Sequence, residues 1–347
     1  NSRILFICGP GNNGKDGILT SSLLKKNTIK AITFSINIDT FTSEIKHFEE
    51  LIETSDVLVD CVFGVGLNRK ISGKFKRVIE LINSSKKQIV SIDIPTGINS
   101  DSGEILGLAV KSNITLAMGF FKPAHFLLPS KKFCGHICLL DLKLKVPKNC
   151  HPEIFLANPE TFVKKLPKFD LEVNKYSKGH TFVLGGTMAG ASRIVSLCAR
   201  KIGSGLSTIL VNSKNLKYFC GVEPGTIVTE FTLDKIPKRI DVLVLGPGLG
   251  KFFDRKNIIK IIKQVNCPII LDADAISIFK NYKNEFYKIL QTKRNIILTP
   301  HQREFDRVFN SNIKNKIHRC LEASKKISNI VVLKGNDTIV AFPEGRV

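Results

Sequence analysis

The first half of the chain alternates short apolar runs with longer stretches in which apolar residues recur every third or fourth position. Runs of about four to eight apolar residues are typical of buried strands, and the periodic stretches are typical of amphipathic helices. Because the apolar runs carry few polar residues and are separated by helices, they predict a Rossmann-like parallel sheet covered on both faces. The predicted strands are residues 3–8, 29–36, 56–64, 87–95, 114–120 and 135–142, and the predicted helices are residues 14–26, 42–55 and 74–85. The helix at residues 42–55 has a predicted Thr/Ser cap ahead of Glu44.

The second half of the chain starts the same kind of pattern again. The intervening stretch, residues 147–174, is rich in Pro, Asn and Lys and has poor periodicity, so we expect a linker there. The chain length of 347 residues also favours about two domains. We therefore predict an α/β protein with domains at residues 1–146 and 175–347. In the second domain the predicted strands are residues 180–187, 206–212, 241–248, 268–274, 295–301 and 329–336, and residues 189–203 form a predicted helix.

The composition limits the partners of the chain. Hydrophobic residues make up 43%, which is enough for sizeable cores, but no apolar run reaches the roughly 20 residues that cross a bilayer. The formal net charge of +22 has two interpretations: a polyanionic partner such as nucleic acid, or solvated lysine-rich faces around a phosphate-bearing ligand. The charge is spread along the chain without aromatic interleaving. The second interpretation is therefore favoured, and we expect neither nucleic acid nor a membrane as partner.

The nine cysteines show no metal-binding pattern. No C-x-x-C occurs, and Cys134 and Cys138 have no second pair that would complete a zinc site. The apolar surroundings of Cys8, Cys61 and Cys198 predict buried thiols in a reducing, cytoplasmic setting. The chain begins at Asn1 almost directly on a strand and ends just after another, so we expect it to be a piece of a longer protein.

The first glycine-rich loop, "GPGNNGKDG", follows the first predicted strand. Gly9, Gly11 and Gly14 fit the G-x-G-x-x-G of a dinucleotide-binding loop, but this pattern alone is weak, and Asp39 is only loosely placed as a ribose-binding acid. The residues between and after the glycines argue for another ligand, because a carboxylate aimed at a pyrophosphate would repel it. These residues are Asn12, Asn13 and Asp16, whose oxygens suit hydroxyls, amides or a cation.

Oxygen-bearing side chains also end two further strands of the first domain. Asp60 closes "VLVD", Asp93 closes "VSID", and Thr96 follows shortly after. Each residue taken alone is more typical of a turn or a helix cap. Because parallel strands end at one edge of a sheet, we expect these side chains to converge with Asp16, where hard oxygens suit a monovalent or divalent cation.

Two more features of the first domain carry chemistry. Residues 63–73, "FGVGLNRKISG", form a second glycine-rich loop whose basic side chains suit phosphates. Lys122 lies between apolar residues in "FFKPAHFLLPS". A partly buried lysine can act as an acid or base, whereas a lysine that reaches solvent would have no such role, and the sequence leaves both open.

In the second domain, polar or glycine-rich turns follow most strands. "GGTMAGA" is a turn of small residues, and "GPGLG" supplies backbone amides for phosphates. Asp272 and Asp274 are carboxylates at a strand end. His301 follows another strand and could hold or protonate a leaving hydroxyl, or could be an ordinary structural histidine.

The motifs of the first domain resemble the NAD(P)H-hydrate epimerase domain of the bifunctional NAD(P)H-hydrate repair family. "GPGNNGKDG", "DCVFGVGL", "SIDIPTGINSDSG" and "FKPAHFLLPSKKFCG" occur in order over most of residues 3–144. The resemblance implies that Asp93 contacts the substrate and that a potassium ion is held by Asn13, Asp60 and Thr96. We expect Asp93, with Lys122, to be the acid/base group. The resemblance also implies that the hydrated nucleotide is contacted by Asp93 and by Asn12, Asn13, Gly14, Lys15, Asp16, Gly64, Val65, Gly66, Leu67, Asn68, Arg69 and Lys70. Lys15 stands where the family has glycine, and its role is unassigned.

The second domain resembles the ADP- or ATP-dependent NAD(P)H-hydrate dehydratase domain, which has a ribokinase-like fold. The resemblance rests on "KGHTFVLGGTMAGAS", "LGPGLG", "LDADAI", "LTPHQREF" and "VVLKGNDT". It implies that Ala191, Gly248 and His301 contact the hydrated nucleotide. It also implies that ADP or ATP, with Mg²⁺, is contacted by Lys334, Gly335, Asn336, Asp337 and Thr338. The family's Gly-x-Gly-Asp motif, which carries a catalytic Asp, would follow this last strand and does not occur in the chain.

Together the two resemblances imply a repair enzyme for hydrated NADH and NADPH. The first domain would interconvert the two epimers of the hydrate, and the second would dehydrate one of them at the expense of a nucleotide. Two other functions stay open: a ribokinase-like small-molecule kinase, and a non-enzymatic binding protein with an epimerase-like domain. We also expect a homo-oligomer.

Overall fold

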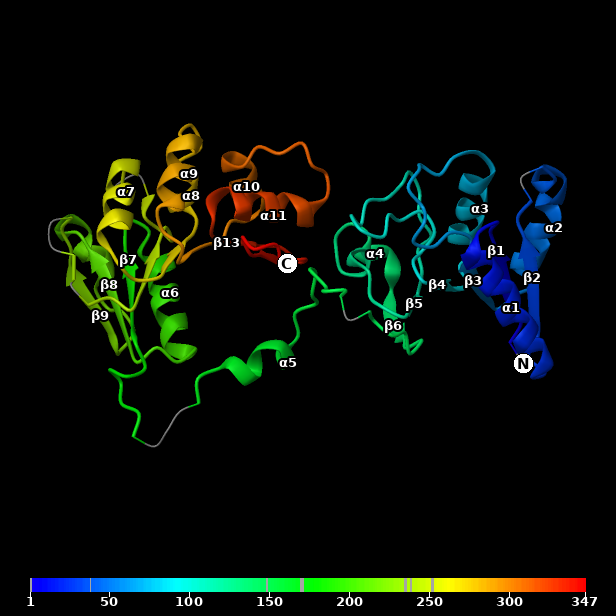
Figure 1. Ribbon diagram of the computed structural model, residues 1–347, viewed down its shortest axis with the longest axis horizontal. Helices are drawn as coiled ribbons and strands as arrows, with labels where there is room; N and C mark the ends of the chain where they lie inside the picture. Colours follow the sequence, from blue (N-terminus) through cyan, green and yellow to red (C-terminus); the bar gives the residue numbers. More distant parts are fainter. Residues whose placement is uncertain are drawn as a thin grey trace. The chain divides into compact units, whose positions relative to one another are not determined.

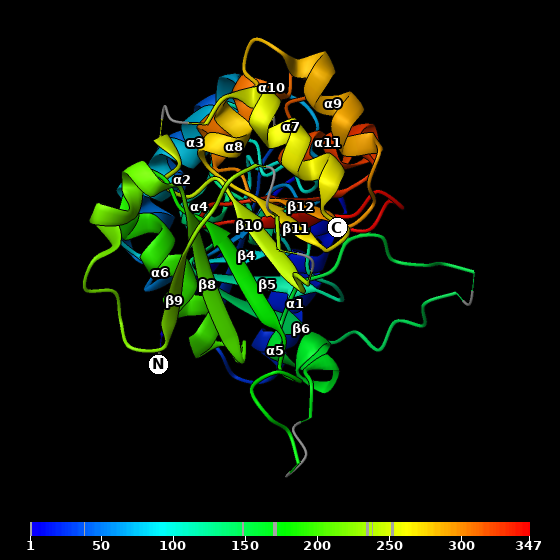
Figure 2. The same cartoon turned by 90° about the vertical axis from the view of Figure 1, so that its left-hand side faces the viewer.

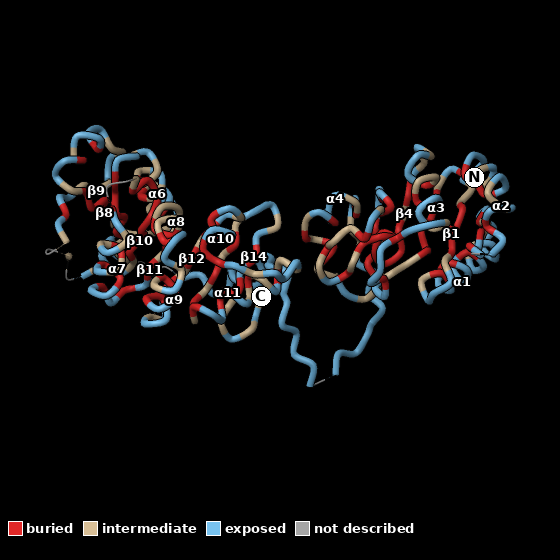
Figure 3. The backbone as a smooth tube through the Cα atoms, turned by 90° about the horizontal axis from the view of Figure 1, so that it is seen from above, coloured by how far each residue is buried: buried red, intermediate tan, exposed pale blue. Residues whose placement is uncertain are grey.

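The computed structural model describes residues 2–37, 39–147, 149–168, 172–233, 236–237, 239–250 and 253–347. The chain divides into two compact units, residues 1–150 and residues 151–347, and each is described by itself (Figure 1). The linker predicted at residues 147–174 stays a prediction, although the described residues between 141 and 168 are all exposed, as the pale tube in Figure 3 shows.

The first unit is a six-stranded parallel sheet in the order β2-β1-β3-β4-β5-β6. This confirms the predicted parallel sheet, and all six predicted strands occur. The strands are β1 (Ile4–Cys8), β2 (Ala31–Ser35), β3 (Val57–Cys61), β4 (Gln88–Ile92), β5 (Ile114–Met118) and β6 (His136–Leu140). The helices are α1 (Asn12–Lys26), α2 (Phe41–Glu53), α3 (Gly73–Ser84), the short η1 (Pro123–His125) and α4 (Lys131–Cys134).

Both faces of this sheet are apolar because alternate residues of each strand point to opposite sides. Leu5 and Ile7 of β1 belong to a core with Phe48 of α2 and Ile79 of α3. Phe6 and Cys8, which point to the other side of the strand, belong to a separate core, against which Leu24 of α1 packs. The helices α2 and α3 therefore cover one face of the sheet, and α1 covers the other.

Two local predictions, one in each unit, are wrong. The start of α2 has no side-chain cap ahead of Glu44: the residue before the helix, Thr40, has helical backbone angles, and Ser43 donates its hydroxyl to the Thr40 carbonyl instead. Cys198 is exposed, whereas Cys8 and Cys61 are fully buried as predicted. The Cys198 error arises because its helix, α6 (Ala189–Lys201), turns Ile194 and Cys198, one helical turn apart, to the outside.

The second unit has an eight-stranded sheet in the order β14-β13-β12-β11-β10-β7-β8-β9, in which only the β13–β14 pair is antiparallel. Figure 2 shows β8 and β9 side by side. The strands are β7 (His180–Leu184), β8 (Leu206–Val211), β9 (Thr226–Glu230), β10 (Val242–Leu245), β11 (Ile269–Leu271), β12 (Ile296–Leu298), β13 (Ile330–Leu333) and β14 (Ile339–Ala341).

The helices of this unit fill the connections between the strands. They are α5 (Pro159–Phe162), η2 (Val163–Lys165), α6 (Ala189–Lys201), η3 (Ser213–Phe219), α7 (Arg255–Gln264), α8 (Asp274–Ser277), α9 (Lys283–Gln291), α10 (Gln302–Val308) and α11 (Lys316–Ile327). The pattern did not predict β9, whose side chains are mostly exposed and polar, as expected for an edge strand. Among the described residues, no helix has the length and apolar character needed to cross a membrane.

Candidate functional site

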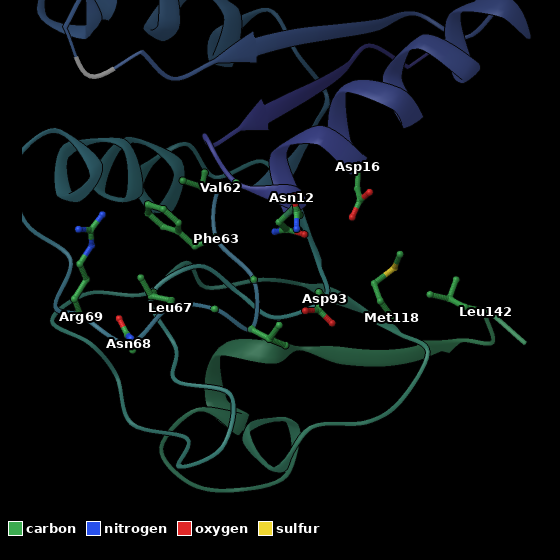
Figure 4. Close-up of a pocket in the computed structure, with 15 residues that line it drawn as sticks. Asn12, Asp16, Val62, Phe63, Leu67, Asn68, Arg69, Asp93, Met118 and Leu142 are labelled. Carbon is green, nitrogen blue, oxygen red and sulfur yellow. The ribbon is translucent and has the colours of Figure 1, made fainter. Parts of the chain in front are cut away.

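The first candidate site is a cavity of about 620 Å³ in the first unit. It opens where the chain crosses from one side of β1 to the other, which is the switch point at which parallel sheets bind ligands. In Figure 4, Arg69 and Asn68 stand on one side, Met118 and Leu142 on the other, and Asp93 between them. The lining residues are Gly11, Asn12, Asn13, Asp16, residues 62–69, Asp93, Met118 and Leu142.

The loops that form the cavity pack backbone against backbone. A Cβ added to Gly9 would lie 2.0 Å from the carbonyl oxygen of Val62, and one added to Gly14 would lie 1.9 Å from the carbonyl oxygen of Gly9. Only glycine allows such an approach. Gly9 therefore lets the loop after β1 lie against the segment after β3, and Gly14 lets the first turn of α1 lie against Gly9.

Most substrate-contacting residues expected from the motifs line this cavity, but three of them do not. Gly14 is buried beneath the loop, and Lys15 is exposed and lies outside the lining. Lys70 lines a neighbouring pocket of about 190 Å³, which shares Arg69 with the cavity. Asp39 lies outside the lining as well, in an exposed turn after β2.

Asp93 is, with Asp16, one of the two aspartates that line the cavity. Its backbone is in the left-handed region with a φ of +67°, a conformation that non-glycine residues adopt at a cost, and its side chain is mostly buried. Oδ1 accepts a hydrogen bond of 2.5 Å from Nζ of Lys122. Oδ2 lies toward Gly64 and the side chain of Asn13, since a Cβ added to Gly64 would be 3.2 Å from it.

Lys122 is a partly buried lysine, with 17% of its side chain exposed. Its Nζ also donates to the carbonyl oxygen of Met118 at 2.8 Å. The structure thus decides between the two interpretations of Lys122: the ammonium is held inside the protein beside Asp93 instead of reaching out to solvent. Two groups that can carry and release protons are therefore in direct contact at the cavity wall.

Asp60 lies below the cavity and is 1% exposed. Oδ1 accepts hydrogen bonds from Oγ1 of Thr96 at 2.6 Å and the Val62 amide at 3.2 Å. Oδ2 accepts from the Thr96 amide at 2.9 Å and Oγ of Ser91 at 2.7 Å. Burial raises the pKa of Asp60, and the hydrogen bonds offset this only in part. All these donors are neutral, so the charge of the ionised carboxylate has no cationic partner among the described contacts.

The oxygen atoms of Asp60, Thr96 and Asn13 are of the kind that binds a hard cation. A buried carboxylate without a cationic partner, a threonine hydroxyl and the amide oxygen of Asn13 offer the oxygen ligands that such ions prefer. Asn13 also lines the cavity, with Nδ2 3.4 Å from the carbonyl oxygen of Ile92. Among the described residues no group of three His, Cys, Asp or Glu side chains could hold a metal, so these contacts offer no zinc-type site there.

The second candidate site lies at the switch point of the second sheet, between β7 and β10. A Cβ added to Gly248 would lie 2.3 Å from the Met188 carbonyl oxygen and 3.1 Å from Cβ of Ala191. Gly248 has a φ of +72°, which also favours glycine. The structure therefore brings Ala191 and Gly248 together, as the resemblance implies.

The two carboxylates that follow β11, Asp272 and Asp274, both bind other groups of the protein. Asp272 forms an ion pair of 2.6 Å with Nζ of Lys334, which follows β13. Oδ2 of Asp274 accepts a hydrogen bond of 2.9 Å from the amide of Gly250. These contacts join the segments that follow β10, β11 and β13 at one end of the sheet.

His301 caps α10 in the structure. Its Nδ1 accepts from the amides of Arg303 and Glu304, at 3.1 and 3.4 Å, and its Nε2 lies 3.2 Å from Oε1 of Glu304. The Glu304 side chain in turn accepts from the His301 amide, which completes a capping box. Both ring nitrogens thus have partners inside the protein, which favours the structural interpretation of His301. Contact with a ligand through its exposed edge stays a prediction.

Residues 334–338, the predicted nucleotide contacts, form a tight turn. Thr338 donates its hydroxyl to the Gly335 carbonyl oxygen at 2.7 Å, and the Gly335 amide lies 3.1 Å from the same hydroxyl. Lys316 of α11 holds Asp337 by an ion pair of 2.5 Å. The turn is thereby fixed at the edge of the sheet, beside the Asp272–Lys334 pair.

Taken together, the fold and the two candidate sites define a two-domain α/β protein of the kind that binds nucleotides at sheet switch points. Residues 35–124 match the family described as YjeF-related protein N-terminus, and residues 181–347 match the family described as NAD(P)H-hydrate dehydratase. The chain is thus similar, in order, to a YjeF-related domain and to an NAD(P)H-hydrate dehydratase domain, which confirms the resemblance predicted from the motifs.

Relatives cover nearly the whole chain. The bifunctional NAD(P)H-hydrate repair enzyme of Thermofilum pendens is 27% identical over 394 residues, which covers 98% of this chain and 72% of the relative. That of Synechocystis is 29% identical over 379 residues, which covers 99% of this chain and 71% of the relative. A solved ADP/ATP-dependent NAD(P)H-hydrate dehydratase from Bacillus subtilis, co-crystallised with ATP/Mg²⁺, matches 52% of this chain and 66% of its own, with 24% identity and a TM-score of 0.42.

Sequence reasoning missed three residues near the first cavity. Met118 and Leu142 line it, and His125 lies directly behind Asp93. Met118 and Leu142 look like ordinary strand residues, so no pattern marks them. His125 had a usable signal, because it follows Lys122 by three residues and Pro123 forces a turn between them.

Proposed function

We propose that this protein is an enzyme of nicotinamide-nucleotide repair. The first unit interconverts the two epimers of hydrated NADH or NADPH, and the second dehydrates one epimer back to NADH or NADPH with ADP or ATP. The observation that carries the proposal is the Asp93–Lys122 pair at the wall of a cavity at a sheet switch point. The names of the relatives, which cover nearly the whole chain, support both activities.

The residues on the two sides of the cavity indicate how the hydrated nucleotide is oriented in it. Arg69, with the glycine-rich loop around it, suits the phosphates, and Met118 with Leu142 offers an apolar wall for the nicotinamide ring (Figure 4). Placed in this way, the ring lies near Oδ2 of Asp93. Oδ1 is already occupied by Lys122, so Oδ2 is the oxygen available for proton transfer.

Inversion at the hydroxyl-bearing ring carbon requires its hydroxyl to leave and to return on the other face. Asp93 gives a proton to the departing hydroxyl, which leaves as water while the ring nitrogen supplies the electron pair. Water then adds to the opposite face and returns a proton to Asp93, so the reaction is a net isomerisation. Lys122 keeps the carboxylate in place and balances its charge. General acid/base catalysis of this kind contributes about 10²- to 10⁴-fold.

In the second unit, residues 334–338 and the Asp272–Lys334 pair would hold the adenine nucleotide with its Mg²⁺. Phosphorylation of the hydroxyl would make it a good leaving group, and its elimination would restore the reduced nicotinamide. Ala191 and Gly248 would lie against the hydrated ring, where small residues leave room. The homo-oligomer stays a prediction.

The test of the first activity is an epimer-exchange assay. A purified single epimer of hydrated NADH, incubated with the protein and no nucleotide, should reach the epimer equilibrium at least about 100-fold faster than in buffer. Exchange is followed by chromatographic separation of the epimers. A small-molecule kinase or a binding protein would leave the epimer ratio at its buffer rate, and that result would rule out the epimerase.

A potassium ion at Asn13, Asp60 and Thr96 is part of the proposal. Replacing K⁺ with tetramethylammonium, which is too large for such a site, should lower the Tm of the first unit by about 3 to 6 °C, because a bound ion stabilises the folded state. Asp60→Asn should abolish this difference. Burial raises the pKa of Asp60, so the K⁺ effect should shrink as the pH falls and the carboxyl takes up a proton.

The matched control for the ion is Glu80→Gln, which removes an exposed carboxylate paired with Lys76 and Arg77 on α3. It should keep the full K⁺ effect. Circular dichroism follows both units, and tyrosine fluorescence follows the second alone, because the four tyrosines all lie there. A K⁺ effect of the same size in Asp60→Asn would place the ion elsewhere.

A further inference from the structure

His125 is a fully buried histidine between the two acid/base candidates of the first unit. Its Nδ1 lies 3.0 Å from the amide nitrogen of Lys122, and its Nε2 lies 2.8 Å from the carbonyl oxygen of Asp93. Asp93 and His125 are 32 positions apart in the sequence and come from different loops. The imidazole therefore joins the residue that follows β4 to the turn that follows β5, in addition to the pairing of these two strands in the sheet.

The partners determine the tautomer of the ring. A backbone amide can only donate, so Nδ1 accepts and carries no proton, while a carbonyl can only accept, so Nε2 carries the proton. A second proton on Nδ1 would face the Lys122 amide and break the first hydrogen bond. Burial lowers the pKa of His125, and the nearby Lys122 ammonium lowers it further. The neutral ring is thus the form that fits this position.

The bridge closes a ring of contacts around both functional groups. The side chains of Asp93 and Lys122 meet at 2.5 Å, and their backbones are joined through His125. Pro123 holds Lys122 in an extended conformation, and Asp93 adopts its unfavourable positive φ. A single buried side chain therefore supports a strained residue and the turn that supplies its partner. Phe121 and Phe126 pack edge-on against the ring and keep it in place.

We infer that His125 is a positioning residue for the proposed epimerisation: its neutral imidazole holds the backbones of Asp93 and Lys122 so that carboxylate and ammonium meet at the cavity. This inference rests on the proposed function of the first unit. His125 does not line the cavity, so its effect reaches the substrate only through Asp93 and Lys122. Loss of the bridge lets these groups move, and a displacement of about 1 Å in a catalytic group costs about 100-fold in rate.

Two variants separate the bridge from the packing. His125→Phe keeps an aromatic ring for Phe121 and Phe126 but removes both hydrogen bonds, while His125→Gln can still donate to the Asp93 carbonyl. We expect kcat for epimer exchange to fall about 10- to 100-fold in His125→Phe and less in His125→Gln, with KM nearly unchanged. The matched control is His47→Gln on the exposed face of α2, which should keep the parent kcat.

Each kcat is expressed per folded site, counted by the stoichiometry of substrate binding. If His125 only stabilised the fold, the folded fraction of each variant would keep the parent kcat, and the inference would be wrong. A second readout needs no activity: the rate at which a water-soluble acylating reagent labels Lys122, mapped by mass spectrometry. Labelling should be slow in the parent and several times faster in His125→Phe, because the Asp93–Lys122 pair loosens.

The two readouts keep the inference separate from the proposed function. If the parent exchanges no epimers but Lys122 labelling rises in His125→Phe, the proposed function is wrong and the positioning of the pair stands. If the parent is active and neither kcat nor labelling changes, the inference is wrong and the function stands. Nitrogen NMR of the parent gives an independent check, because protonation of Nδ1 at neutral pH would contradict the bridge.

Discussion

Asp93→Asn is expected to reduce epimer exchange by at least about 100-fold, with the first unit still folded. The amide keeps the shape of the side chain and can still accept from Lys122, but it can neither give nor take a proton. The side chain is small and lies at a cavity wall, so the substitution leaves the apolar core untouched. The measurement is kcat for exchange of a purified epimer, normalised to the number of substrate-binding sites.

Glu80→Gln is again the control, since it makes the same acid-to-amide change on the solvent side of α3 in the same unit. Substrate affinity should fall little in Asp93→Asn, because Arg69 and the glycine-rich loop remain. Epimer exchange by Asp93→Asn at the parent rate would mean that Asp93 is not the acid/base group. Loss of both exchange and binding would instead give Asp93 a role in holding the nucleotide.

Whereas the short helices η1 and α4 were not predicted, the six strands and the three long helices of the first unit could be predicted closely. Leu5, Phe6 and Ile7 illustrate the reason: the sheet is covered on both faces, so every residue of the strand is apolar and the run stands out. The edge strand β9 was missed for the converse reason. One side of it meets solvent, so its polar residues resemble those of a loop.

The site was predicted less completely than the fold. Strand ends identified Asp60, Asp93 and Thr96, because parallel strands bring their carboxyl ends to one edge. The pairing of Asp93 with Lys122 depends on a turn near Pro123 that no periodicity describes. His301 shows the opposite case: its place after a strand suggested chemistry, whereas its capping of α10 depends on Glu304, three residues later.

Gly14→Ala is the second substitution for which we expect a large effect. The added methyl group would lie 1.9 Å from the carbonyl oxygen of Gly9 and within 2.9 Å of two other Gly9 atoms. These neighbours are backbone atoms, so no side chain can move aside, and either α1 or the loop after β1 must shift. We expect a loss of about 3 kcal/mol or more in the free energy of unfolding of the first unit, together with the loss of epimer exchange.

Gly11→Ala is the matched control for this prediction. Gly11 lies in the same loop, and a Cβ added there would have no heavy atom within 4 Å. Its φ of −92° suits any residue, so the cost should stay below about 1 kcal/mol. Hydrogen exchange of the β1 and β3 amides in urea measures the first unit, and tyrosine fluorescence shows whether the second is unaffected. Equal stability of the two variants would mean that the close contact between Gly14 and Gly9 does not govern the loop. A selective loss in Gly14→Ala would show that the close approach of α1 to Gly9 holds the loop after β1 in place at the cavity, whatever ligand the cavity binds.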